Sequence, residues 1–189
     1  MKCIIVHGLN SCGKELVEQG RRLQNERDWI PWLKVKLEKN GYESHNPLMP
    51  KFWEPSYEKW KEKFEQFEIG ENTVLVGHSL GGGFLLRYLS ENKIKVKKLV
   101  LIAPSVIAPE EFPSIKGFYN FNLDKSLPER THDMVVFYSD NDFSRINESV
   151  EYLKTRLGFR FIELKGQGHF IRKDMGTVKF PELLEEVLS

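Results

Sequence analysis

The sequence predicts an α/β fold: a three-layer α/β/α sandwich around a mostly parallel, doubly wound sheet. Short apolar segments alternate along the chain with longer segments whose apolar residues recur at helical spacing. Most short segments are followed by Gly, Pro, Ser or Asp, as buried strands usually are. The alternation implies helices on both faces of the sheet. With 189 residues, 40% of them hydrophobic, the chain can bury one sizeable core. We therefore expect a single domain over residues 1–189.

Six segments are predicted to be strands, and the second has the weakest pattern. They span residues 3–6, 42–45, 73–76, 99–103, 134–138 and 159–164. In open parallel sheets, the functional loops lie at the carboxyl ends of the strands, near the switch in strand order. We therefore expect catalytic residues to follow strands and not to precede them.

Five apolar stripes predict helices, and we interpret their side chains as core. The stripes are Trp29, Trp32, Leu33 and Leu37; Tyr57, Trp60, Phe64 and Phe67; Phe84, Leu85, Tyr88 and Leu89; Val150, Leu153 and Leu157; and Leu183, Leu184, Val187 and Leu188. Two intervals are less regular. Residues 10–28 are polar, charged and expected to be partly helical, whereas residues 104–133 contain four prolines.

The pentapeptide Gly77-His78-Ser79-Leu80-Gly81 fits the G-x-S-x-G pattern of a nucleophile elbow. Such a serine occupies a sharp turn between strand and helix, and its neighbours must be small because the chain reverses tightly there. The alternative is a serine that only caps the following helix. An apolar strand precedes Ser79 and an apolar-striped helix follows it, and this context favours the nucleophile.

A serine hydroxyl needs a base, which is usually a histidine oriented by a carboxylate. Among five histidines, His169 lies in a glycine-flanked loop, KGQGHFIR, after the last predicted strand. In this hydrolase plan the nucleophile, the acid and the histidine follow one another along the chain. That order favours His169. His78 adjoins Ser79, so its side chain should point elsewhere.

The acid should follow the strand at residues 134–138, where Asp140 and Asp142 are the candidates. Either residue can also be a turn former whose carboxylate bonds nearby backbone N–H groups. We favour Asp142 because it lies in the middle of the predicted loop, and we interpret Asp140 as the turn former.

Two backbone N–H groups are expected to form an oxyanion hole. One belongs to Leu80, directly after the nucleophile. The second should come from the loop after the first strand, IIVHGLNSCG, where Leu9 is the first choice and Asn10 the second. Cys12 lies in the same loop and is interpreted as a loop thiol, since no base is specified for it.

Substrate contacts are predicted on both sides of Ser79. Asn10 and His78 are polar candidates beside the expected oxyanion hole. In the segment 104–133, the aromatic candidates for an apolar wall are Phe112, Phe118, Tyr119 and Phe121. Trp53, in the stretch MPKFWEPS, is a candidate from the other side. Plain packing is the alternative role for these aromatic side chains, because aromatic residues seek burial in either case. Short segments of this kind suggest small or medium acyl groups.

Composition excludes several other classes. A formal net charge of +1 argues against nucleic acid as the main partner. The two cysteines, Cys3 and Cys12, do not suggest a disulfide framework, and the N-terminus lacks a signal-peptide pattern. No segment approaches a transmembrane length. We expect a cytoplasmic protein without membrane association, and the triad chemistry needs neither metal nor organic cofactor.

The motifs VHGLN, GHSLGG, SDND and GQGHF together resemble the α/β-hydrolase fold, and they occur in its order. The short length and the stretch WIPWLKVKLEKNGYE resemble the small serine hydrolases of the retinoblastoma-binding protein 9 type. The resemblance implies a compact fold without a large lid domain. It also implies Ser79 as nucleophile, Asp142 as acid, His169 as base, and hydrolysis of small ester-type substrates.

The leading hypothesis is therefore a serine hydrolase that cleaves small to medium carboxylic esters through an acyl-enzyme. A peptidase or amidase is an alternative, because the same triad serves amides. A non-catalytic protein-binding module on this fold is a second alternative, since a fold does not fix a function.

Overall fold

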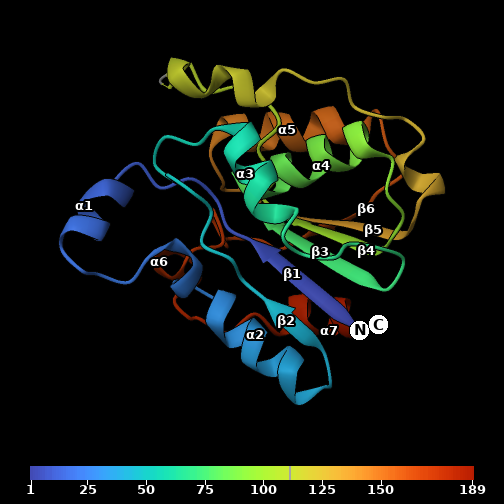
Figure 1. Cartoon of the computed structure of the whole chain (residues 1–189), viewed down its shortest axis with the longest axis horizontal. Helices are drawn as coiled ribbons and strands as arrows, with labels where there is room; N and C mark the ends of the chain where they lie inside the picture. The colour runs from blue at the N-terminus through green and yellow to red at the C-terminus, as the bar shows by residue number, and fades with distance from the viewer. Residues whose placement is uncertain (111) are drawn as a thin grey trace.

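The computed structural model describes residues 1–110 and 112–189. Six strands form one sheet in the order β2-β1-β3-β4-β5-β6, and every neighbouring pair is parallel (Figure 1). The strands are β1 (Lys2–Val6), β2 (Glu43–His45), β3 (Thr73–His78), β4 (Val96–Ile102), β5 (Thr131–Tyr138) and β6 (Arg160–Glu163). Each predicted strand is present, and the predicted fold class is confirmed.

Seven α-helices are described, five of them between strands and two after β6. They are α1 (Gly13–Glu18), α2 (Ile30–Lys39), α3 (Tyr57–Phe64), α4 (Leu80–Asn92), α5 (Ser144–Lys154), α6 (Arg172–Met175) and α7 (Pro181–Leu188). Three short 3-10 helices complete the described elements: η1 (Gln24–Glu26), η2 (Pro113–Tyr119) and η3 (Leu127–Glu129). Pro31 and Pro181 lie in the first turns of α2 and α7, where a missing N–H costs no helical hydrogen bond.

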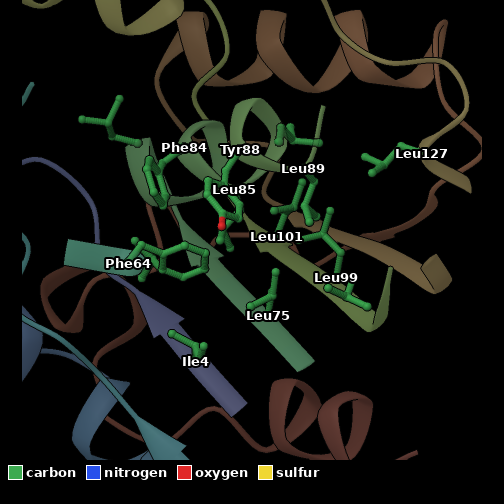
Figure 2. Packing of buried hydrophobic residues seen from close by; sticks show 14 of the residues in the cluster. Ile4, Phe64, Leu75, Phe84, Leu85, Tyr88, Leu89, Leu99, Leu101 and Leu127 are labelled. Atoms are coloured by element: carbon green, nitrogen blue, oxygen red, sulfur yellow. The ribbon is translucent and has the colours of Figure 1, made fainter. Parts of the chain in front are cut away.

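Side chains alternate between two core clusters on the two faces of the sheet. Leu75 belongs to the cluster under α3, α4 and α5, whereas Val74 and Val76 belong to the cluster with α2 and α7. Figure 2 shows the first cluster, in which the Phe64 ring lies edge-on to Tyr88 with centroids 5.0 Å apart. The core therefore lies on both sides of one sheet, as the three-layer prediction requires.

The strand order reverses beside β1, because the chain first adds β2 on one side and then β3 on the other. In such sheets a crevice opens at the carboxyl ends of the strands at this switch point. The loop after β1 and the turn after β3 both lie there. This placement brings residues 8–10 next to residues 79–80.

β4 and β5 each begin three residues earlier than predicted, at Val96 and Thr131. The added residues pair across the two strands, Val96 with Thr131 and Lys98 with Asp133, and the charged residues among them interrupt the apolar pattern. These charged residues take part in a partly buried network. The Lys98 ammonium lies 3.1 Å from Glu186 Oε1 and 3.3 Å from Asp133 Oδ2. The Arg160 guanidinium donates to both Glu186 carboxylate oxygens, at 2.7 and 2.8 Å. These bonds attach α7 to β4, β5 and β6.

Replacing Glu186 by alanine should lower the free energy of unfolding by about 3 kcal/mol, because it leaves the buried Lys98 charge with fewer partners. Urea denaturation measures this change. Glu182→Ala is the matched control, since Glu182 is exposed in the first turn of the same helix. Equal effects of the two substitutions would show that the network does not stabilise the fold.

Candidate active site

Ser79 lies between the last residue of β3 and the first residue of α4, with φ 53° and ψ −120°. A positive φ is strained for a residue with a side chain, so the surroundings must hold it. The Ser79 N–H donates to the Ile102 carbonyl at 2.9 Å. The Ser79 carbonyl accepts from the N–H groups of Gly82 and Ser105, each at 3.0 Å. The local geometry is that of a nucleophile elbow.

Two glycines make this turn sterically possible. A Cβ on Gly81 would lie 2.3 Å from the Val6 carbonyl oxygen, and a Cβ on Gly77 would lie 2.7 Å from Gly82 Cα. Both distances are far inside van der Waals contact. Only residues without side chains therefore allow α4 to start this close to β1 and β3.

His169 follows β6 and pairs with Asp142, which follows β5. The imidazole Nδ1–H donates to the two Asp142 carboxylate oxygens, at 2.9 and 3.1 Å. The Asp142 side chain is fully buried, whereas that of His169 keeps 15% of its surface exposed. With Nδ1 as the donor, a neutral His169 ring carries its unprotonated nitrogen at Nε2.

The four residues of the SDND motif have separate partners in the loop at residues 166–169. Ser139 Oγ accepts from the Gln167 N–H, Asp140 Oδ1 from the Gly166 N–H and Asn141 Oδ1 from the Gly168 N–H, at 2.8 to 2.9 Å. Asp142 alone bonds the imidazole. The structure thus separates the two candidate acids: Asp140 braces the loop, and Asp142 contacts His169.

His78 was predicted to contact the substrate, and this prediction is wrong. Its side chain is buried and is not among the residues that line the cavity beside Ser79. Its Nε2–H donates to the His169 carbonyl at 2.8 Å, and the two imidazole rings lie 4.9 Å apart. Burial lowers the pKa of His78 to about 3. His78 is therefore a neutral support beneath the His169 loop.

His7 is a second buried, neutral imidazole. Its Nδ1–H donates to the Gly8 carbonyl at 2.8 Å, and its Nε2 accepts from the Met49 N–H at 2.9 Å. Burial lowers the pKa of His7 to about 4. Protonation of Nε2 would break the bond to Met49, so the neutral form holds the loop after β1 in place.

Ser79 and His169 line one cavity of about 880 Å³ at the carboxyl edge of the sheet. Leu9, Asn10 and Leu80 border it as predicted, together with Phe112 and Tyr119. The rest of the 105–119 wall is mostly apolar, contributed by Ile107, Ala108, Pro109 and Ile115. The cavity offers an apolar surface next to the Ser79 hydroxyl.

Phe118 does not belong to this wall. It is 4% exposed and packs edge-on against Trp60 at 5.3 Å and Tyr57 at 5.9 Å. In the 3-10 helix η2, neighbouring residues point in different directions, so Tyr119 faces the cavity while Phe118 enters the core. Proline-rich segments lack the regular period that would have revealed this division.

The backbone N–H groups at the cavity differ in their partners. The Asn10 N–H donates to the Phe52 carbonyl at 3.1 Å. Within the described residues, the N–H groups of Leu9 and Leu80 donate no hydrogen bond. Gly8 brings the first of these groups close to Ser79, since a Cβ there would lie 2.9 Å from Ser79 Cβ. Leu9 and Leu80, and not Asn10, can therefore donate to a ligand.

Sequence reasoning did not single out Ser105 and Arg145, which both line the cavity. Ser105 Oγ accepts from the Arg145 guanidinium at 2.9 Å and lies 3.1 Å from the Tyr119 hydroxyl. Ser105 lies three residues after the end of β4, so the rule that functional residues follow strands would have found it. Arg145 is in the first turn of α5 and carried no such signal.

Residues 1–110 and 112–189 show neither a candidate metal site nor a candidate membrane span. No group of histidine, cysteine and carboxylate side chains there has an arrangement that could hold a metal ion. Likewise, none of the helices described has the length and apolar character needed to cross a membrane.

The parallel sheet, the elbow after β3 and the Asp–His pair after β5 and β6 define an α/β-hydrolase. The sequence profile of the serine hydrolase family matches residues 16–188, and the chain belongs to this family. The YdeN protein of Bacillus subtilis (strain 168) is 25% identical over 177 residues, covering 90% of this chain and 92% of that protein.

Solved structures agree with this fold. The crystal structure of the ydeN gene product of B. subtilis has a TM-score of 0.78 at 22% identity and covers 99% of this chain and 96% of that one. Est1E from Butyrivibrio proteoclasticus, solved with ferulic acid bound, has a TM-score of 0.68 at 14% identity, covering 98% and 86%. Carboxylesterase CesB (YbfK) from B. subtilis has a TM-score of 0.60 at 13% identity, covering 100% and 82%.

The two buried histidines predict a pH-dependent stability. Their pKa values in the folded protein lie below the unfolded value, so the folded state binds fewer protons and stability falls as the pH drops below about 6.5. From about pH 6.5 to about pH 5, His7 alone should remove about 2 kcal/mol from the free energy of unfolding.

Urea denaturation of wild type and His7→Gln at both pH values tests this. The glutamine can still accept from the Met49 N–H but does not titrate, so the variant should lose less stability on acidification. His132→Gln is the control, because His132 is exposed. An unchanged pH slope in His7→Gln would contradict the explanation.

Proposed function

We propose that this serine hydrolase cleaves small to medium carboxylic esters through an acyl-enzyme, with Ser79 as nucleophile, His169 as base and Asp142 as acid. The observation that carries the proposal is the arrangement at one cavity. The Ser79 hydroxyl, the His169 imidazole bonded to buried Asp142, and the two N–H groups of Leu9 and Leu80 all belong to it.

In the proposed first step, Ser79 Oγ attacks the ester carbonyl carbon while His169 Nε2 takes the hydroxyl proton. Asp142 holds the imidazole through Nδ1–H and stabilises the imidazolium that forms. The N–H groups of Leu9 and Leu80 donate to the oxyanion. His169 then gives the proton to the leaving alcohol, and the C–O bond of the ester breaks.

In the second step, water attacks the acyl-enzyme while His169 removes a proton from it, and Ser79 leaves with that proton restored. The apolar residues of the 105–119 wall are proposed to hold the acyl chain. Two structural neighbours support an ester substrate over an amide substrate: the carboxylesterase CesB, and Est1E with its bound ferulic acid. An amidase or peptidase needs stronger protonation of its leaving group and is the second candidate.

The third candidate, a non-catalytic binding module, would leave the site idle. The intact contacts of Asp142 and His169 favour catalysis over this candidate. We propose that the protein acts in the cytoplasm, which is consistent with the free thiols of Cys3 and Cys12. We also propose that it is related to the small serine hydrolases of the retinoblastoma-binding protein 9 type.

Wild-type protein should react covalently with a fluorophosphonate probe at Ser79 and hydrolyse p-nitrophenyl esters of short acyl chains. Ser79→Ala should lose the label and lower kcat by about 10⁵-fold or more. Mass spectrometry of the labelled peptide and a spectrophotometric assay measure the two effects. If Ser79→Ala hydrolyses the esters as fast as wild type, another residue is the nucleophile; if neither protein does, the binding module is favoured.

Asp142→Asn should lower kcat by about 10⁴-fold, because an amide in place of the carboxylate favours the wrong His169 tautomer. Asp140→Asn is the matched control. Its amide oxygen can still accept from the Gly166 N–H, so it should keep kcat within about threefold of wild type and chiefly affect stability. The reverse pattern would assign the acid to Asp140.

A further inference from the structure

A second cavity, of about 800 Å³, continues from the first one along the molecule. Its lining residues come from two segments, residues 16–32 and residues 171–178, which include parts of α1 and α6. Arg27, Asp28 and Ile171 line both cavities. Asp28 also ties the two walls together, because its Oδ1 accepts from the Arg172 N–H at 2.8 Å. We call this second cavity the basic groove.

Five of the residues lining the basic groove carry a positive charge, against two acidic residues, Glu26 and Asp28. The five are Arg21, Arg22, Arg27, Arg172 and Lys173. In the described part of the chain, none of these five side chains forms an ion pair with a carboxylate, although many surface lysines elsewhere do. The whole protein has a formal net charge of only +1, so positive charge is concentrated here.

The groove also has an apolar part. Trp32, Pro31, Leu16 and Val178 line it together with the charged side chains. A ligand with an apolar body and an anionic end would therefore satisfy both parts. Guanidinium groups bind carboxylate and phosphate oxygens in pairs of charge-assisted hydrogen bonds, and a shared cavity wall brings such an anion within reach of the Ser79 site.

We propose that the preferred substrates are esters whose alcohol part ends in an anion, a carboxylate or a phosphate. This inference rests on the proposed ester hydrolysis. The acyl part occupies the apolar 105–119 wall, and the alcohol part passes Arg27 and Asp28 into the basic groove. There Arg22 and Arg172 bind the anionic end and act as residues that determine specificity. They take no part in the bond-breaking steps.

The test uses three series of acetate esters, each in three chain lengths. In the first series the alcohol part ends in a carboxylate, in the second in the corresponding neutral primary amide, and in the third in a phosphate. Wild type should show a kcat/KM about tenfold higher for an anionic ester than for the amide of the same length, chiefly through a lower KM. Added salt should reduce this ratio, because solvent-exposed charges are screened. The phosphate and carboxylate series show which anion is preferred.

Arg22→Gln combined with Arg172→Gln should bring the anion-to-amide ratio close to one. The matched control, Lys39→Gln combined with Lys125→Gln, removes the same charge at exposed positions outside both cavities and should keep the wild-type ratio. Equal kcat/KM for anionic and neutral esters in wild type, or a ratio that survives the arginine substitutions, would overturn the inference while leaving ester hydrolysis intact. Failure of wild type to hydrolyse any ester of the series would instead contradict the proposed function, and the substrate inference with it.

Discussion

The close approach of α4 to the sheet is the constraint on which the rest of this structure depends. A nucleophile elbow requires Ser79 to keep a positive φ. That backbone is held by hydrogen bonds to Ile102 at the end of β4, to Ser105 in the loop after β4, and to Gly82 in α4 itself. The bonds form only because Gly77 and Gly81 leave room for the helix start against β1. The same approach places Leu80 at the cavity and brings the loop after β1 beside it. The strain at Ser79 and the position of Leu9 and Leu80 at the cavity thus result from one packing contact.

A buried imidazole and several side-chain hydrogen bonds support the opposite side of the site. His169 lies in a loop that Ser139, Asp140 and Asn141 hold by three backbone hydrogen bonds, and His78 supports its carbonyl from below. The Trp29 indole N–H donates to the next carbonyl, that of Phe170, at 3.0 Å. These hydrogen bonds from several segments fix the position of the His169 imidazole beside the cavity.

The two cavities divide the surroundings of Ser79 by chemistry. The 105–119 wall is largely apolar, and the groove beside α1 and α6 is basic. Both are built from intervals without a regular apolar period, on top of a sheet that is common to the family. This division fits the general behaviour of the fold, in which the sheet positions the reacting groups and the connecting segments select what reaches them.

The sequence alone determined the strand-helix alternation, the elbow around Ser79 and the chain order of serine, acid and histidine, because these are local patterns with a fixed period or spacing. It left Asp140 and Asp142 as alternatives, since both follow the same strand, and only the folded loop shows that one bonds Gly166 and the other His169. It also placed Phe118 and His78 near a substrate, whereas packing buries both. The early parts of β4 and β5 contain charged residues, among them Lys98, whose partner Glu186 lies on α7. Local periodicity reports which face of an element is apolar, but contacts between distant segments decide which polar groups find partners and which side chains remain open to a ligand.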